Sequence, residues 1–247
     1  MKIAQYLDST YLKTPEQSGI SNEETLQIDK ELAQEAIDHG IFAVMIRPDY
    51  VADIKKYIQE RHSDVVVGTV IGFHEGTYTV DEKLAEASKA IEDGADELDF
   101  VINYNAYLKG DLALVKEEFV KCTTLALQNQ KIAKWIIEIA ALTDAQIADI
   151  TKNISDWSVE NFSENDLPNI FVKSSTGFYQ TEDGKPNGAT FEGIKIMLDN
   201  AGKLPVKAAG GVRTPEDAEK MISMGVKRIG TSSALNLIKN ESSSGGY

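Results

Sequence analysis

Short apolar runs rich in β-branched residues alternate with amphipathic stretches along the whole of this 247-residue chain. Eight of the runs predict strands, over residues 3–7, 42–46, 65–71, 97–102, 135–141, 170–174, 205–209 and 228–231. The stretches between them predict helices, for example 31–39, 53–61, 80–93, 112–128, 144–155, 191–201 and 215–223. Eight strand–helix repeats in about 250 residues are typical of an α/β (β/α)8 TIM barrel. A doubly wound open sheet is the alternative that the same alternation allows.

The chain is expected to form a single domain. No linker or low-complexity segment interrupts the alternation, and the length is sufficient for a substantial core. We therefore assign residues 1–240 to one barrel domain. Residues 241–247 (ESSSGGY) are predicted to be a flexible C-terminal tail, because small polar residues and glycine bury little apolar surface.

The overall charge limits the partners of the protein. The net charge of −14 argues against nucleic-acid binding, which depends on many lysines and arginines that neutralise phosphates. An anionic substrate would have to be held by local backbone donors instead. The single cysteine, Cys122, allows no disulfide framework, and neither a signal peptide nor an apolar run of about 18 residues is present. We expect a cytoplasmic protein with no membrane contact.

Two lysines end neighbouring predicted strands and precede small residues. Lys173 lies in the segment FVKSSTG, and Lys207 lies in VKAAGG. A buried site and a nearby cation both lower the pKa of an ammonium group, and a neutral amine can attack a carbonyl carbon. The pair therefore suggests an enzyme that forms a lysine Schiff base.

Strand alternation places four charged side chains in the barrel interior. Asp99, Glu138, Lys173 and Lys207 each alternate with apolar residues that should face the helices. A purely structural layer of ion pairs is the alternative interpretation. Both lysines lie near the carboxyl ends of their strands, where barrel enzymes build their active sites, and this favours the functional interpretation.

Glycine- and serine-rich segments follow the last two predicted strands. Gly210-Gly211 follows one strand, and Gly230 to Ser233 end the other. Glycine allows close approach of the backbone to a ligand, and phosphosugar barrels bind phosphate at the equivalent loops. Ordinary turns are the alternative, but the two positions together favour a phosphate site.

Four segments strongly resemble the deoxyribose-phosphate aldolase family. They are ELDFVIN (97–103), VKSSTGF (172–178), VKAAGGVRT (206–214) and RIGTSS (228–233). LDSTYLK (7–13), VIGF (70–73) and KLAE (83–86) also resemble segments of that family. The resemblance covers nearly the whole chain, in order.

The resemblance implies a class I aldolase that needs no metal or other cofactor. Such an enzyme reversibly cleaves 2-deoxy-D-ribose 5-phosphate to D-glyceraldehyde 3-phosphate and acetaldehyde. By motif position, Lys173 resembles the Schiff-base lysine, Lys207 the second lysine, and Asp99 the acid–base carboxylate. Tyr247 resembles a terminal tyrosine that assists proton transfer in some members, although it could equally be the end of a disordered tail. A homodimer is expected because dimers are common in the family.

The resemblance also implies a set of substrate-binding residues. Gly211, Gly230, Ser232 and Ser233 resemble the phosphate-binding set. The full expected set is Asp8, Leu12, Thr176, Gly177, Gly210, Gly211, Gly230, Ser232 and Ser233.

The chain departs from the usual family pattern at four places. Met45 replaces a frequent cysteine, His74 replaces a proline, Ile139-Ala140 replaces Thr-Gly, and the loop after Gly177 is longer than usual. These differences affect substrate range more than the reaction class. Another Schiff-base phosphosugar aldolase, a transaldolase or a thiolase of the same barrel type is the main alternative. A phosphosugar isomerase and a non-catalytic phosphosugar-binding protein are further alternatives.

Overall fold

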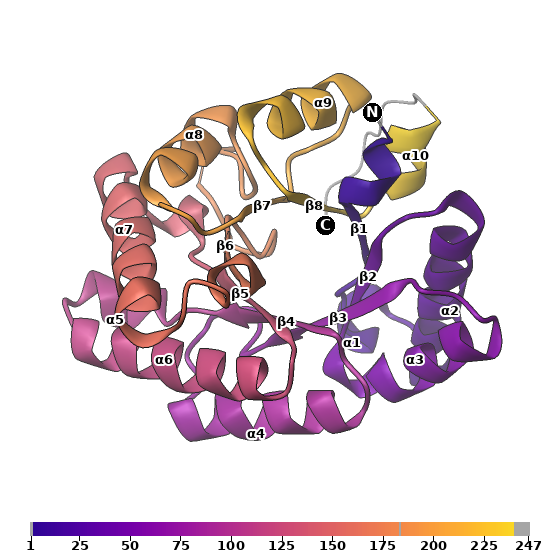
Figure 1. Ribbon diagram of the computed structural model, residues 1–247. Coiled ribbons are helices and arrows are strands. Elements are labelled where there is room, and N and C mark those ends of the chain that lie inside the picture. Colours follow the sequence, from indigo (N-terminus) through magenta and orange to yellow (C-terminus); the bar gives the residue numbers. More distant parts are fainter. Residues whose placement is uncertain (1, 183, 240–247) are drawn as a thin grey trace.

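The computed structural model describes residues 2–182 and 184–239 and contains a closed barrel of parallel strands in chain order (Figure 1). Each strand pairs with its sequence neighbours, and β1 pairs with β8 to close the barrel. This closure confirms the predicted TIM barrel and contradicts the doubly wound alternative. The strands are β1 (Leu7–Thr10), β2 (Ala43–Ile46), β3 (Val66–Ile71), β4 (Glu97–Val101), β5 (Ile132–Ile136), β6 (Ile170–Lys173), β7 (Val206–Ala209) and β8 (Arg228–Thr231).

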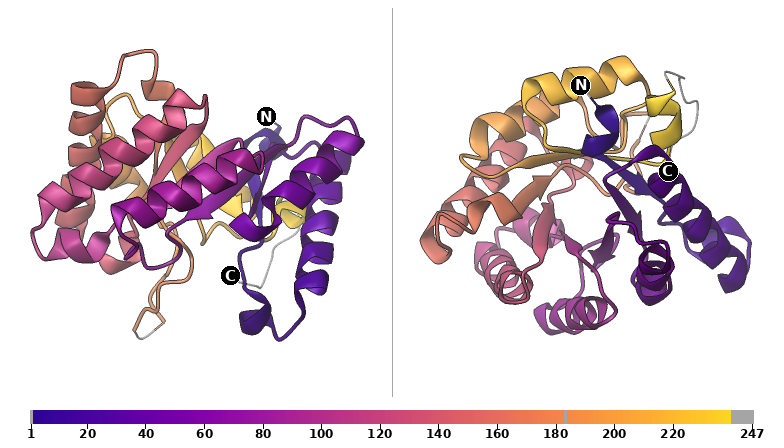
Figure 2. Two further views of the ribbon diagram at one scale, coloured as in Figure 1. Left: turned by 90° about the horizontal axis from the view of Figure 1, so that it is seen from below. Right: turned by 45° about the vertical axis from the view of Figure 1, so that its right-hand side comes forward.

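Helices surround the barrel, as the two further views in Figure 2 show. Several begin with a capping box in which the side chain of Thr14, Ser21, Thr79 or Thr143 accepts a hydrogen bond from the backbone amide three residues later. The α-helices are α1 (Pro15–Ser18), α2 (Asn22–His39), α3 (Val51–Glu60), α4 (Val80–Glu92), α5 (Tyr104–Leu108), α6 (Leu112–Gln128), α7 (Asp144–Asn161), α8 (Phe191–Asn200), α9 (Pro215–Met224) and α10 (Ala234–Ile238). Short 3-10 turns are η1 (Ile3–Tyr6), η2 (Pro48–Tyr50), η3 (Ile139–Ala141) and η4 (Leu167–Asn169).

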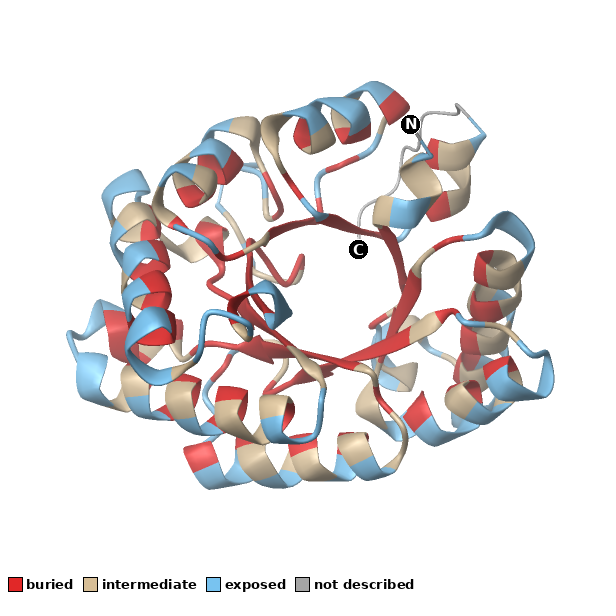
Figure 3. Ribbon diagram, in the orientation of Figure 1, coloured by how far each residue is buried: buried red, intermediate tan, exposed pale blue. Residues whose placement is uncertain are grey.

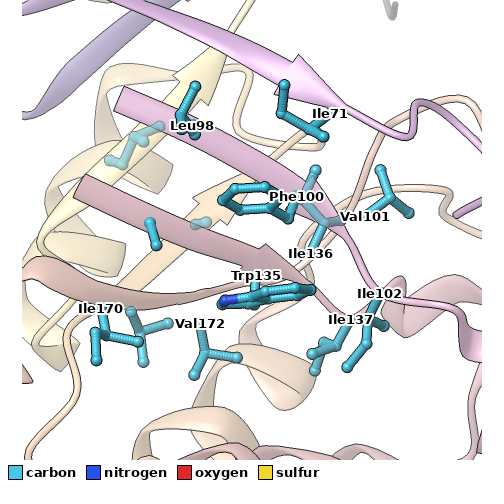
Figure 4. Close-up of a cluster of buried hydrophobic side chains, with 14 of the residues drawn as sticks. Ile71, Leu98, Phe100, Val101, Ile102, Trp135, Ile136, Ile137, Ile170 and Val172 are labelled. Atoms are coloured by element: carbon cyan, nitrogen blue, oxygen red, sulfur yellow. The ribbon is translucent and has the colours of Figure 1, made fainter. Parts of the chain in front are cut away.

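The apolar core lies between the strands and the helices (Figure 3). Phe100 of β4 and Trp135 of β5 stack with ring centroids 5.0 Å apart, and Phe119 of α6 packs on Trp135 (Figure 4 shows the strand side of this cluster). The indole nitrogen of Trp135 donates to Thr123 of α6 at 2.9 Å. These outward-facing side chains confirm the predicted alternation on β4.

Two predicted strands were misplaced. Residues 3–6 form η1, and the first strand is the more polar segment LDST, all of whose residues are buried. The fifth strand begins three residues earlier than predicted and ends at Ile136. In both cases the prediction followed an adjoining apolar run, because the true strand contains polar or charged side chains. The short helices α1, α5 and α10 were not predicted.

The limits of the domain remain predictions. The last described helix, α10, ends at Ile238, and the predicted tail lies outside the described residues. Among the helices of the described chain, none combines the length and the apolarity that crossing a bilayer requires.

Candidate active site

Asp99 lies at the centre of a group of buried charges inside the barrel. It is inaccessible to solvent, and its Oδ2 atom accepts hydrogen bonds from Lys173 and Lys207, each at 2.8 Å. Its Oδ1 atom accepts a third bond, also 2.8 Å, from Lys134 of β5. The structure therefore brings the predicted Asp99, Lys173 and Lys207 together.

The ion pairs continue around the barrel to its first and last strands. Nζ of Lys207 lies 2.5 Å from Oδ2 of Asp8 on β1, and Arg228 of β8 donates to the other oxygen of Asp8. Arg228 also donates to Glu97 at 2.9 Å, and Glu97 accepts from Lys134 at 2.5 Å. Asp8, expected to contact substrate, is thus first of all the ion-pair partner of Lys207. We call this set the ion-pair layer: Asp8, Glu97, Asp99, Lys134, Lys173, Lys207 and Arg228.

The charges of the ion-pair layer do not balance when every lysine is protonated. It holds three carboxylates and four cations, so one positive charge is in excess. Within the described residues Lys173 has one carboxylate partner, Asp99, which it shares with two other lysines. An excess buried charge is costly, and loss of a proton from Lys173 restores neutrality.

The pKa values of the two lysines are shifted in opposite directions. Burial lowers the pKa of Lys173 to about 8; Asp99 opposes this shift, and the cation of Lys207 adds to it. Burial also acts against the charge of Lys207, but Asp8 and Asp99 outweigh it and raise the pKa of that lysine. Burial likewise opposes the charge of Asp99, yet the surrounding lysines hold the pKa of this carboxyl well below its usual value. The result is a fixed ion pair beside an amine that deprotonates easily.

Glu138 does not belong to the ion-pair layer, contrary to the prediction from alternation. β5 ends at Ile136, and Glu138 follows in a left-handed conformation with φ of 58°. Its buried carboxylate accepts hydrogen bonds from the amide and the hydroxyl of Thr176. The predicted extended strand through Glu138 was wrong, so the alternation rule does not apply to this residue, although its side chain is buried.

Apolar and aromatic side chains line the carboxyl end of the barrel near the predicted pocket residues. Leu12 is buried with Met45 and Val70, and Phe73 and Phe178 pack against this cluster. Thr176 and Gly177 are also buried and directly follow the Lys173 strand.

His74 lies at the same end of the barrel and stacks on Phe178, with ring centroids 5.7 Å apart. The loop that carries Phe178 projects beyond the carboxyl ends of the strands (Figure 2). These contacts connect the loop after β3 with the loop after β6.

The predicted phosphate segments lie together at the ends of β7 and β8. Gly210 and Gly211 have φ of 69° and 76°, values that favour glycine. A Cβ atom on Gly211 would lie 2.6 Å from the carbonyl oxygen of Ala189, which returns from the long loop. The amide of Gly210 donates to the carbonyl of Gly230, so the two segments are directly joined. Ser232 is exposed, and Ser233 immediately precedes α10.

The sequence reasoning missed Lys134 and Arg228. Alternation from Trp135 backwards would have placed Lys134 inward, had the strand been extended to its true start. Alternation from Ile229 would have done the same for Arg228. Tyr247 lies outside the described residues. In the described ranges, no three histidine, cysteine or acidic side chains are grouped so that they could hold a metal ion.

Comparison with known proteins identifies the family. A model described as DeoC/LacD family aldolase matches residues 5–239. The deoxyribose-phosphate aldolase of Caldicellulosiruptor saccharolyticus is 38% identical over 242 residues, which cover 97% of this chain and 98% of that protein. The deoxyribose-phosphate aldolase of Deinococcus radiodurans is 35% identical over 248 residues, which cover both chains completely.

Solved structures agree with this result. The tetrameric deoxyribose phosphate aldolase of Aeropyrum pernix has a TM-score of 0.75 and 29% identity, covering 96% of this chain and 89% of that one. A structure described as QR15, an aldolase, has a TM-score of 0.79 and 28% identity, covering 97% and 95% of the two chains. Dihydrodipicolinate synthase, at 13% identity and a TM-score of 0.60, shares the fold alone. The chain belongs to the DeoC/LacD family of aldolases.

Proposed function

We propose that this protein is a class I aldolase that reversibly cleaves 2-deoxy-D-ribose 5-phosphate to D-glyceraldehyde 3-phosphate and acetaldehyde. Lys173 is the Schiff-base lysine of this proposal. The observation that carries it is the position of Lys173, buried beside Asp99 and Lys207 in a layer with one cation too many. That position keeps its amine ready to lose a proton near neutral pH, as attack on a carbonyl requires.

The reaction begins on the open-chain form of the sugar phosphate. The neutral amine of Lys173 attacks the C1 aldehyde, and the resulting carbinolamine loses water to give an iminium ion. Removal of the proton from the C3 hydroxyl then breaks the C2–C3 bond, which releases glyceraldehyde 3-phosphate and leaves an enamine on the lysine. Protonation of the enamine at C2 and hydrolysis of the new iminium release acetaldehyde and restore Lys173.

Lys207 and Asp99 have different tasks in this scheme. Lys207 keeps its charge because Asp8 and Asp99 raise its pKa. It can therefore donate a proton to the hydroxyl group that leaves the carbinolamine as water. Asp99 stays ionised over the working range and orients both lysines, and in this proposal it polarises an ordered water that carries protons to and from the substrate without protonation of the carboxylate itself. The residue expected as an acid–base group therefore acts mainly through its charge.

The phosphate group of the substrate is assigned to the two glycine segments. Gly210 and Gly211 keep the backbone open to a ligand, and Gly230, Ser232 and Ser233 lie on the adjoining strand end. Neutral amides and hydroxyls can hold an anion in a protein whose net charge is −14. Asp8, Leu12, Thr176 and Gly177 complete the proposed pocket.

The decisive experiment compares wild type with Lys173→Ala. We expect wild type to turn over deoxyribose 5-phosphate and to be trapped by borohydride in the presence of acetaldehyde, with the added mass on the peptide containing Lys173. Lys173→Ala should show neither. If borohydride traps the wild-type protein but the protein cleaves another sugar phosphate and not deoxyribose 5-phosphate, it is a different Schiff-base aldolase. A wild type that is never trapped would overturn the proposal.

Three further expectations belong to the proposal. Tyr247 is assigned to proton transfer at the methyl carbon of acetaldehyde, and removal of this residue should slow exchange of the methyl protons. Unchanged exchange would end that assignment. A homodimer and a cytoplasmic location remain predictions. The molar mass from light scattering would distinguish a dimer from a tetramer such as the one described for the Aeropyrum pernix relative.

A further inference from the structure

Glu138 occupies a bulge between β5 and β6. The amide of Ile137 donates to the carbonyl of Lys173 at 3.0 Å, and the amide of Ile139 donates to the next carbonyl, that of Ser174, at 2.9 Å. Two amides that are two residues apart thus bond to acceptors that are one residue apart. Glu138 is the extra residue, and its positive φ interrupts the extended backbone at this point.

The carboxylate of Glu138 anchors the segment that follows Lys173. Its Oε2 atom accepts from the amide of Thr176 at 3.1 Å and from the hydroxyl of the same residue. Because the Thr176 hydroxyl donates its proton to Glu138, its oxygen is free to accept from the amide of Phe178, which it does at 3.0 Å. The other carboxylate oxygen, Oε1, is buried and has no hydrogen-bond partner in residues 2–182 and 184–239.

This anchor extends across the end of the barrel. The ring of Phe178 packs edge-on against Phe73 with centroids 5.1 Å apart, and it also stacks on His74. The side chain of Asn187 donates to the carbonyl of Gly177 at 2.8 Å and so ties the far part of the loop to the same segment. Glu138 thereby holds the loop that contacts the opposite side of the barrel mouth.

The charge of Glu138 is coupled to that of Lys173. Burial raises the pKa of Glu138 to about 7, while the Thr176 hydrogen bonds and the Lys173 cation oppose the rise. Since this coupling is reciprocal, ionised Glu138 favours the protonated form of Lys173. The other groups that act on Lys173 are Asp99, Lys134 and Lys207, and the nearby Tyr104 has its own pKa raised to about 12.

On the basis of the proposed function, we propose that Glu138 is a positioning residue of the aldolase reaction. Through Thr176 it holds the segment between Lys173 and Phe178, and from that position its charge helps to set the protonation state of the Lys173 amine. A non-glycine residue in the left-handed region is strained, so surrounding contacts must stabilise it. For Glu138 these contacts lie in the segment that follows Lys173.

Two substitutions separate these effects. Glu138→Gln keeps an oxygen for Thr176 and removes the charge, whereas Glu138→Leu removes both. Glu118→Gln is the matched control, because Glu118 is another buried carboxylate that accepts from a backbone amide and a lysine, those of Asn103 and Lys83, outside the ion-pair layer.

The measurements are kcat and KM for deoxyribose 5-phosphate and the pH dependence of borohydride trapping with acetaldehyde. For Glu138→Gln we expect the trapping midpoint to move to lower pH by roughly half a unit, with turnover largely kept. For Glu138→Leu we expect kcat to fall by about tenfold to a hundredfold because the Thr176 segment is displaced. Glu118→Gln should lower the melting temperature and leave the trapping midpoint unchanged.

Two results would overturn the proposal. One is a folded Glu138→Leu with wild-type kcat, KM and trapping midpoint. The other is a combination of two results: Glu138→Gln keeps the wild-type pH midpoint of trapping, and Glu138→Leu has a lower melting temperature but wild-type kcat and KM. That combination is expected of a residue with a purely structural role. If Glu138→Leu does not fold, the midpoint of Glu138→Gln decides alone. Failure of the aldolase assignment itself would be seen separately, as a wild type with no turnover and no trapped lysine.

Discussion

The ammonium nitrogens of Lys173 and Lys207 both lie 2.8 Å from a single atom, Oδ2 of Asp99. Lys207 has a second carboxylate partner, Asp8, whereas Lys173 has no second one in the part of the chain that the structure describes. The shared oxygen therefore cannot stabilise both ammonium groups equally, and the lysine with the single partner gives up its proton more readily. This inequality between two paired strand positions lowers the pKa of Lys173 and raises that of Lys207, as the proposed roles of nucleophile and permanent cation require.

Replacing Lys207 should make Lys173 harder to deprotonate. In Lys207→Met the neighbouring cation is lost and Asp99 is left to Lys173 and Lys134, so the pKa of Lys173 should rise. We expect the pH midpoint of borohydride trapping to increase by about one unit and turnover at pH 7 to fall by about a hundredfold. Lys55→Met, which breaks a pair with Asp96 outside the ion-pair layer, should change neither quantity. An unchanged trapping midpoint in Lys207→Met would contradict the assigned role.

Replacing the reactive lysine should stabilise the protein at neutral pH. The pKa of Lys173 is about 8 in the folded chain against an ordinary value of 10.5. Between these two pH values the unfolded chain binds more protons than the folded chain. The free energy of unfolding therefore rises with pH over that range, and below pH 8 the charge of Lys173 destabilises the folded protein. Lys173→Met should gain roughly 3 kcal/mol of unfolding free energy at pH 7, and the gain should shrink towards pH 10. Urea unfolding at both pH values tests this, and a variant less stable than wild type at pH 7 would refute it.

Asp29 in α2 should destabilise the protein in alkaline solution. Both of its carboxylate oxygens are buried with no hydrogen-bond partner among the described residues, and burial raises its pKa from 3.8 to about 8. The folded chain binds the extra proton between these values, so stability is full at low pH and falls as pH rises towards 8. Asp29→Asn removes this titration. The difference in unfolding free energy between this variant and wild type should grow by roughly 4 kcal/mol from pH 5 to pH 9. A difference that does not grow with pH would show that Asp29 has another partner.

The phosphate assignment can be tested at Gly211. In Gly211→Ala the new methyl group would meet the carbonyl of Ala189 at a positive φ, which should cost about 2 kcal/mol of stability and disturb the adjoining amides. We expect KM for deoxyribose 5-phosphate to rise by about tenfold, while turnover of unphosphorylated deoxyribose stays nearly constant. Gly110→Ala is the matched control, because Gly110 also has a positive φ but no atom near its Cβ position. Equal losses with both sugars would argue against phosphate binding at this loop.

The sequence predicted the barrel and the centre of the site, because both depend on local patterns. Repeated strand–helix alternation predicted the closed barrel, and period-two alternation placed Asp99, Lys173 and Lys207 inside it. Local patterns could not show that Asp8 and Arg228 meet, since their contact depends on the first and last strands pairing. They also could not place Glu138, whose position follows from a bulge set by two bonds to β6. Pairing between distant strands, rather than local preference, decided the residues that were missed.

The ion pair between Asp8 and Arg228 has a consequence for newly made chains. It joins residues 220 positions apart, and through Asp8 and Lys207 it belongs to the same set of contacts as Lys173. Before the barrel closes, Lys173 is an ordinary exposed ammonium that is almost fully protonated at neutral pH. It then reacts with aldehydes no faster than surface lysines do. The low pKa of the Lys173 amine therefore depends on the burial and the neighbouring cations that the closed barrel provides, and an unfolded chain lacks both.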